Sequence, residues 1–197
     1  ERVEALIAGG TPLGLDRSRS ICREITARAG SSFAVGIRLT PGRCRPDMHA
    51  LYAWMRLADD AADADAPSEE RCRVLDRFAL LTEQALAGEV LDQGIWPALH
   101  SSMVSCGLKP EWFRSLLDGV RQDLQPIAFE DDSELVRYCD RVAGNVGRCC
   151  VAIWGLRTGV DLASVFDLAG QRGRAFQLIN ISRDTGEDAR AGRRYVP

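Results

Sequence analysis

Residues 51–63 read Leu-Tyr-Ala-Trp-Met-Arg-Leu-Ala-Asp-Asp-Ala-Ala-Asp. Ala and Leu make up much of this stretch, and both favour helices, so it predicts a helix. Asp59 and Asp63 are four residues apart and share one helical face, with Arg56 one turn earlier on the same side. A solvated acidic face would give the same pattern, since about 0.1 matches to Asp-Asp-x-x-Asp are expected by chance at this Asp content. The stretch therefore predicts a helix. Its acidic face is either a functional site or a solvated surface.

The rest of the chain carries the same helical signature. Alternating β-branched residues are almost absent, while Ala, Leu and Arg are abundant. Asp16 and Ser133 are predicted helix caps, and residues 41–46 are a predicted loop. The predicted helices cover about residues 16–29, 31–40, 47–66, 68–88, 97–106, 110–126, 133–156 and 162–187. We therefore predict an all-α fold, with residues 1–197 forming one helical domain.

Composition excludes several classes of protein. The chain is 46% hydrophobic and 27% charged, which is typical of a globular protein, and it has no apolar run of the roughly 20 residues that span a bilayer. A net charge of −3 argues against a nucleic-acid partner. Seven cysteines without a CxxC pattern suggest free thiols, and the first residues lack signal-peptide features. We therefore expect a cytoplasmic protein.

A second polar stripe occupies residues 177–188. Asn180, Asp184 and Asp188 recur every four residues, and Gln177 extends the stripe by nearly one turn. Surface helices usually mix opposite charges along one face, whereas this stripe stacks acceptors without a matching cation. Closely spaced carboxylates repel one another, so the stripe predicts a need for counter-charge.

A divalent cation held between the two acidic stripes would supply this counter-charge. Ligands that are all oxygens suit Mg²⁺ or Mn²⁺ and not zinc or copper. Mg²⁺ commonly bridges carboxylates to substrate phosphates, which predicts a magnesium–diphosphate site. Nearby arginines could neutralise the remaining phosphate oxygens, with plain surface charge as the alternative for each. These arginines are Arg56, Arg183, Arg193 and Arg194.

Two glycines inside the predicted helix 133–156 require a reason, because Gly in a helix costs about 1 kcal/mol relative to Ala. Gly144 and Gly147 lie in an apolar segment of small residues. Close packing of helices is one explanation, and room for an apolar ligand chain is the other.

Five segments, taken in order, resemble motifs of the squalene/phytoene synthase family of head-to-head prenyl transferases. The resemblance extends over about residues 18–197. The segments are residues 32–41, 52–63, 118–124, 138–147 and 177–197.

The resemblance implies an all-α, isoprenoid synthase-type helical bundle with a central cavity, in which this chain lacks the C-terminal helices. It implies 1′–1 condensation of two prenyl diphosphates through a cyclopropyl intermediate to phytoene or, through presqualene diphosphate, to squalene. Farnesyl or geranylgeranyl diphosphate would be the substrate. Mg²⁺ would be the cofactor, and Mn²⁺ could replace it. NADPH would be needed only if the product is squalene. An oily product is compatible with peripheral membrane contact, and the oligomeric state cannot be read from the sequence.

The resemblance also assigns roles to individual residues. The implied metal-binding residues are Asp59, Asp60, Asp63, Asn180, Asp184 and Asp188, with Glu187 assisting. The implied catalytic residues are Tyr52, Arg56, Tyr138, Arg183 and Arg193. The implied substrate-binding residues are Ser32, Phe33 and Gln177.

Two alternatives to an active synthase are left by the sequence. Because family members usually continue beyond the Tyr-x-Pro motif at residues 195–197, the chain could be a truncated, inactive homologue that binds prenyl lipids. An unrelated helical scaffold with acidic faces is the other alternative, and five motifs in order argue against it.

Overall fold

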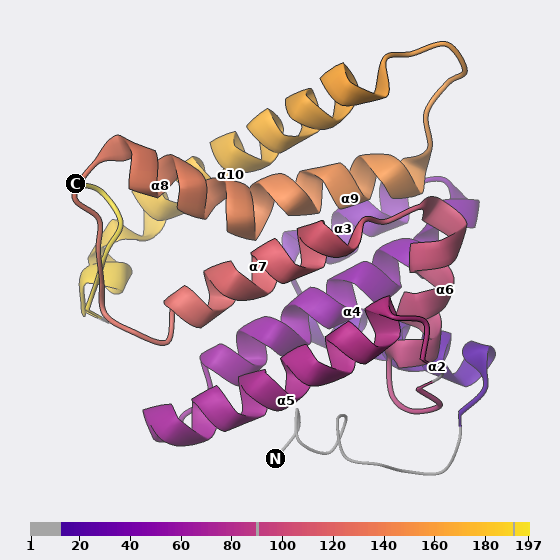
Figure 1. The fold of residues 1–197 in the computed structure, drawn as a ribbon, viewed down its shortest axis with the longest axis horizontal. Coiled ribbons are helices and arrows are strands. Elements are labelled where there is room, and N and C mark those ends of the chain that lie inside the picture. The colour runs from indigo at the N-terminus through magenta and orange to yellow at the C-terminus, as the bar shows by residue number, and fades with distance from the viewer. Residues whose placement is uncertain (1–12, 90, 191) are drawn as a thin grey trace. The chain divides into compact units, whose positions relative to one another are not determined.

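The computed structural model describes residues 13–89, 91–190 and 192–197, and it is built mainly of helices (Figure 1). In chain order these are α2 (Leu15–Ala29), α3 (Ser32–Leu39), the 3₁₀ turn η1 (Gly42–Cys44), α4 (Arg45–Ala62), α5 (Ser68–Leu86), α6 (Trp96–Cys106), α7 (Pro110–Gln122), α8 (Asp132–Cys139), the π-helical turn η2 (Asp140–Gly144), α9 (Asn145–Trp154) and α10 (Leu162–Arg190). The predicted all-α class is confirmed. Within the described residues, no helix is long and apolar enough to cross a membrane.

The chain divides into two compact units. The first extends to Lys109 and includes Ala152–Gly155, and the second comprises Pro110–Val151 and Leu156–Pro197. The two acidic stripes of the sequence lie in different units, since Asp59 belongs to the first and Asp184 to the second. The assignment of residues 1–197 to a single domain stays a prediction.

Helix α4 is the centre of the first unit. It contacts α2, α3, α5 and α6, and Ala50, Ala53, Trp54 and Ala58 on it are completely buried. Small alanine side chains let neighbouring helices approach, while the Trp54 indole fills the remaining space and donates a hydrogen bond to Thr82 Oγ1 at 3.0 Å. Burial of this apolar face leaves the acidic face of α4 pointing away from the core.

Several predicted helix ends are confirmed and others are wrong. Gly30 and Gly107 end α2 and α6 with positive φ angles of 59° and 62°, as their positions predict. Helix α4 stops at Ala62 instead of 66, because Asp63, with φ −94° and ψ 5°, already leaves the helical conformation. Helix α7 ends at Gln122 instead of 126. The predicted loop at residues 41–46 contains η1 and the first turn of α4.

The single helix predicted over residues 133–156 is interrupted. Its cap is Asp131 and not Ser133, because the Asp131 carboxylate accepts a hydrogen bond from the Glu134 amide at 2.9 Å. After Cys139 the chain makes the π-helical turn η2, in which the Asn145 amide donates to the Asp140 carbonyl five residues earlier. The interruption divides the predicted helix into α8, η2 and α9.

Glycines allow α10 to lie directly against η2 and α9 in the second unit. A Cβ atom on Gly173 would overlap with the Ala143 carbonyl, and one on Gly147 would overlap with the Ala169 carbonyl. These glycines therefore serve backbone-to-backbone packing. A Cβ on Gly144 would instead collide with the Asp140 carboxylate, so this glycine also lies at a close contact.

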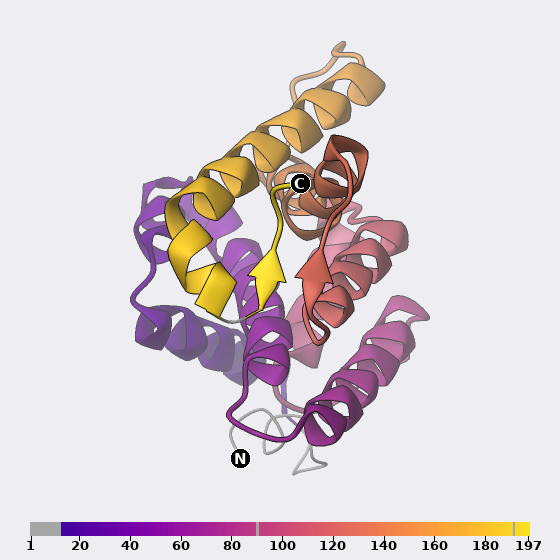
Figure 2. The same cartoon turned by 90° about the vertical axis from the view of Figure 1, so that its left-hand side faces the viewer.

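A short strand pair anchors the residues that follow α10. Strand β1 (Ile127–Ala128) pairs in parallel with β2 (Arg193–Arg194), and Figure 2 shows the two arrows side by side. An apolar cluster lies beside this strand pair, and its residues come from α8, α10, β1 and the residues directly after each strand. Its members are Ile127, Phe129, Leu135, Tyr138, Cys139, Ile181 and Tyr195.

Replacing Gly173 with Ala should destabilise the protein. The added methyl group must displace backbone atoms, which costs about 1–3 kcal/mol, and the better helix propensity of Ala recovers at most about 1 kcal/mol. Urea unfolding monitored by circular dichroism measures the change.

Gly186→Ala is the matched control. Gly186 lies on the same helix as Gly173, but a Cβ atom on it would meet no atom within 4 Å. We expect it to stabilise the protein by about 0.5–1 kcal/mol. Equal effects of the two substitutions would contradict the packing role of Gly173.

Candidate functional site

The acidic face of α4 is open and already contains one ion pair. Asp59 and Asp63 are exposed, four residues apart as predicted. Arg56 Nη2 lies 2.7 Å from Asp60 Oδ1, with both side chains partly exposed. Asp60 is therefore placed to hold the Arg56 guanidinium, while Asp59 in the last turn of α4 and Asp63 directly after the helix present further carboxylates.

Aromatic residues lie about two turns before this acidic face. Tyr52 is 7% exposed, and its hydroxyl is 2.8 Å from Ser31 Oγ. The ring of Phe33 packs against Tyr52 with 5.8 Å between centroids and remains half exposed. Ser32, the predicted substrate-binding serine, is exposed. The serine that binds Tyr52 is instead Ser31, which was not predicted as a site residue.

The polar stripe of α10 carries its own arginines. Arg183 binds Asp184 with both ends of its guanidinium, Nε to Oδ1 at 2.7 Å and Nη2 to Oδ2 at 2.6 Å. Arg193, which follows in β2, lies 3.4 Å from Asp188 Oδ1. The expectation that this stripe lacks a matching cation is therefore wrong, because residues adjacent in sequence or returning after the helix supply the positive charge.

The two carboxylates of the stripe have different environments. Hydrogen bonds from Arg183 lower the pKa of Asp184 below its usual value. Partial burial raises the pKa of Asp188, and the charges of Asp184 and Glu187 add to the rise, although Arg193 opposes it. A further cation near Asp188 would therefore stabilise its charged form.

The donor set of the two stripes suits a hard cation. In the parts of the chain that the structure describes, no three His, Cys, Asp or Glu side chains gather closely enough to hold a metal. Asn180 and Gln177 add amide oxygens to the carboxylates on α10, and all-oxygen ligands are those that Mg²⁺ and Mn²⁺ prefer. A site shared by the α4 and α10 stripes stays a prediction.

Tyr138 lies in a buried hydrogen-bonded group near the strand pair. It is 3% exposed, and its hydroxyl donates to Asp123 Oδ1 and Oδ2 at 2.9 and 3.0 Å. Tyr195 also donates to Asp123 Oδ1, at 3.1 Å, and its ring stacks on Tyr138 with centroids 5.0 Å apart. Burial raises the pKa of the Tyr138 phenol, and the negative charge of Asp123 raises it further. The phenol is therefore held as a neutral donor.

Asp123 is the residue that the sequence analysis missed here. It falls in the segment 118–124 that resembles a family motif, which was a signal for its importance. Nothing local in the sequence indicates its partners, because Tyr138 and Tyr195 follow it by 15 and 72 residues.

The chain matches a known family over most of its length. The family described as "Squalene/phytoene synthase" matches residues 26–197. The presqualene diphosphate synthases of Zymomonas mobilis and Rhodopseudomonas palustris are 36% and 39% identical, over 92% and 85% of this chain. The phytoene synthase of Arthrospira platensis is 34% identical over 95% of this chain.

Solved structures show the same fold. The squalene synthase HpnC from Alicyclobacillus acidocaldarius aligns with a TM-score of 0.82 at 28% identity, covering 93% of this chain and 67% of that one. A dehydrosqualene synthase in complex with ligand aligns with a TM-score of 0.79 at 29% identity, over 92% of this chain and 61% of that one. The chain spans 58–63% of the length of the three curated relatives above.

Tyr138→Phe should destabilise the protein by about 1.5–3 kcal/mol at neutral pH, because it removes a hydrogen bond to a carboxylate. The folded protein holds the phenol proton more tightly than the unfolded chain does, so the stabilising effect is complete below the unfolded pKa. It should decline as pH rises above about 10, and the stability difference between wild type and Tyr138→Phe should shrink there.

Urea unfolding at several pH values from 7 upward measures this difference. Tyr52→Phe is the matched control, because its hydroxyl binds neutral Ser31 and should contribute only about 0.5–1.5 kcal/mol. Equal losses in both variants at neutral pH would contradict the charged hydrogen bond.

Proposed function

Because the chain belongs to the squalene/phytoene synthase family, we propose that it condenses two prenyl diphosphates head to head with loss of diphosphate. The observation that carries this proposal is the retention of both polar stripes with their arginines in a chain that matches the family from residue 26 to 197. All five motif segments lie within that match, so the resemblance drawn from the sequence is confirmed.

In this reaction, the C1–O bond of one substrate breaks and its electron pair leaves with diphosphate. The allylic cation that remains adds through C1 to C2 of the second substrate's C2–C3 double bond, which leaves a cation at C3. Loss of a proton from the attacking C1 to the released diphosphate then lets C1 bond to C3 and closes the cyclopropane ring of the intermediate. The protein must therefore stabilise charge on the leaving group and exclude water from the cation.

The proposed metal-binding residues are those of the two stripes. Asp59 on α4, Asp63 at its C-terminal end, and Asn180, Asp184 and Asp188 on α10 would hold Mg²⁺ or Mn²⁺. When bound, the ion supplies electrostatic stabilisation of the diphosphate oxygens.

The arginines are proposed to bind the remaining diphosphate oxygens. Arg183 is already oriented by two hydrogen bonds to Asp184, and Arg56 is oriented by Asp60. A planar guanidinium suits phosphate recognition because it donates two parallel hydrogen bonds. Arg193 joins them beside Asp188.

The aromatic pair on α3 and α4 is proposed to face the substrate. Half-exposed Phe33 against buried Tyr52 offers a π-face that can stabilise a carbocation and keep water away. Ser32 and partly buried Gln177 are proposed polar contacts for the substrate. We assign Tyr138 to orienting the residues around Asp123, because its hydroxyl is already bound there.

The substrate is proposed to be farnesyl or geranylgeranyl diphosphate. Relatives named presqualene diphosphate synthase are 36% and 39% identical, against 34% for a named phytoene synthase, which favours testing farnesyl diphosphate first. NADPH would be required only for squalene formation. The alternative, an inactive prenyl-lipid-binding homologue, is not favoured by relatives that are named as synthases.

Incubating the 197-residue chain with each prenyl diphosphate and Mg²⁺ should yield a C30 or a C40 product. Mass spectrometry of the extracted products, with and without NADPH, distinguishes presqualene diphosphate, squalene and phytoene. Lipid binding without any product would contradict the synthase proposal and support the inactive homologue.

Asp59→Ala and Asp184→Ala should each lower diphosphate release at least about 100-fold, because each removes a carboxylate from the proposed metal site. A coupled diphosphate assay measures release, and circular dichroism checks that the helices persist. Asp167→Ala, on the exposed surface of α10 before the stripe, is the control and should retain activity. Near-normal turnover in either stripe variant would rule out the metal assignment.

A further inference from the structure

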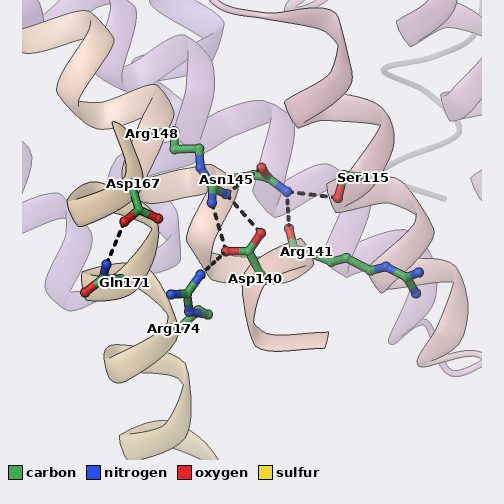
Figure 3. Close-up of polar contacts among 8 residues, drawn as sticks. All are labelled: Ser115, Asp140, Arg141, Asn145, Arg148, Asp167, Gln171 and Arg174. Atoms are coloured by element: carbon green, nitrogen blue, oxygen red, sulfur yellow. Dashed lines mark hydrogen bonds and ion pairs between the residues drawn. The ribbon is translucent and has the colours of Figure 1, made fainter. Parts of the chain in front are cut away.

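Asp140 connects two helices through two arginines in the second unit. Arg148 Nη1 and Nη2 donate to Asp140 Oδ2 and Oδ1 at 3.1 and 3.0 Å, and Arg174 Nη1 on α10 donates to Oδ1 at 2.8 Å (Figure 3). The Arg148 side chain is 16% exposed and that of Asp140 32%. One carboxylate, at the first residue of the π-helical turn, thus joins η2, α9 and α10.

Asn145 extends this network to α7. It accepts a hydrogen bond from Arg148 Nη1 at 2.9 Å and donates to Ser115 Oγ at 3.0 Å and to the Arg141 carbonyl at 3.1 Å. The last bond satisfies a carbonyl inside the π turn, where the regular helical pattern changes. Asn145 is 5% exposed, so its polar atoms depend on these partners.

Glycines make space for the network. A Cβ on Gly144 would overlap with the Asp140 carboxylate, and one on Gly170 would overlap with the Arg148 guanidinium. Gly173, next to Arg174, provides the backbone contact with Ala143 described above. The ion pairs therefore lie at the closest approach of α10 to η2, where a small change in the rotation of α10 would break them.

The charges at this point depend on one another. Burial alone would raise the pKa of Asp140, but hydrogen bonds from Arg148 and Arg174 outweigh it and hold the pKa below its usual value. A neutral side chain at position 140 would leave two partly buried guanidinium groups facing each other without a counter-ion. Loss of the carboxylate would therefore push α10 away from α9.

The same helix carries the polar stripe. Asp184 follows Arg174 by ten residues, about 15 Å farther along α10. The helix is continuous from Leu162 to Arg190, so a rotation at Arg174 is transmitted to Asn180, Asp184 and Asp188.

We propose that Asp140 is a positioning residue that fixes the rotation of α10 and thereby aims Asn180, Asp184 and Asp188 at the metal–diphosphate complex. The inference rests on the proposed function, because it assigns this task to a helix whose far end would bind metal. The Asp140 carboxylate is already bound by Arg148 and Arg174, so its role would be exerted through α10.

The test compares Asp140→Asn with Asp167→Asn in the whole chain. Both changes neutralise an aspartate that accepts hydrogen bonds, but Asp167 is exposed and its bond from Gln171 Nε2, at 2.8 Å, stays within α10 (Figure 3). Mn²⁺ affinity in the presence of inorganic diphosphate is measured by electron paramagnetic resonance. Hydrogen exchange over residues 174–188 is measured by mass spectrometry without metal.

We expect Asp140→Asn to weaken Mn²⁺ affinity about tenfold and to speed exchange over residues 174–188 at least about fivefold. Asp167→Asn should change neither by more than about twofold. Arg174→Gln should reproduce the effects of Asp140→Asn, and it serves as the second variant if Asp140→Asn does not fold. Arg174→Lys, which keeps one charged hydrogen bond, should recover part of the lost affinity.

The outcomes separate the two proposals. Unchanged Mn²⁺ affinity in a folded Asp140→Asn or Arg174→Gln variant would overturn the positioning role, even if exchange increased, because the network would then serve stability alone. Failure of the unmodified chain to bind Mn²⁺ with diphosphate would contradict the proposed metal site, and the positioning role with it.

Discussion

The backbone contact between α10 and the segment formed by η2 and α9 is the constraint on which the second unit depends. Gly147 and Gly173 bring the two backbones so close that no other side chain fits. Such contact gains dispersion energy but excludes the side chains that usually lock two helices in register. Charged hydrogen bonds at the edge of the contact, from Asp140 to Arg148 and Arg174, supply the missing specificity.

Arginine–carboxylate pairs recur along both polar stripes. Arg56 binds Asp60, Arg183 binds Asp184, and Arg193 lies beside Asp188. These pairs reduce repulsion among neighbouring carboxylates and keep the guanidinium groups in defined orientations. In the proposed reaction, a diphosphate bound with a cation would replace the carboxylate partners of the arginines with phosphate oxygens.

Two aromatic pairs near the candidate site have different tasks. Tyr52 and Phe33 form a pair whose outer ring is half exposed, which suits contact with an apolar substrate. Tyr138 and Tyr195 are buried, and both donate hydrogen bonds to Asp123. Their rings belong to the apolar cluster beside the strand pair. The first pair therefore acts through an exposed ring face, and the second pair acts through its hydroxyl groups.

The sequence by itself determined the helical class, most helix positions and the residue types of both polar stripes, because these depend on spacing within one element. Gly30 and Gly107 end helices where local rules place them. Only the tertiary structure decided that Asp123 binds two tyrosines, that Asp140 divides a predicted helix with a π turn, and that Gly147 and Gly173 serve helix contact. The tyrosine and glycine contacts pair residues that are far apart in the chain, and the π turn lies where α10 packs against it. A local pattern cannot encode such a pair, since the partner is chosen by how the helices pack.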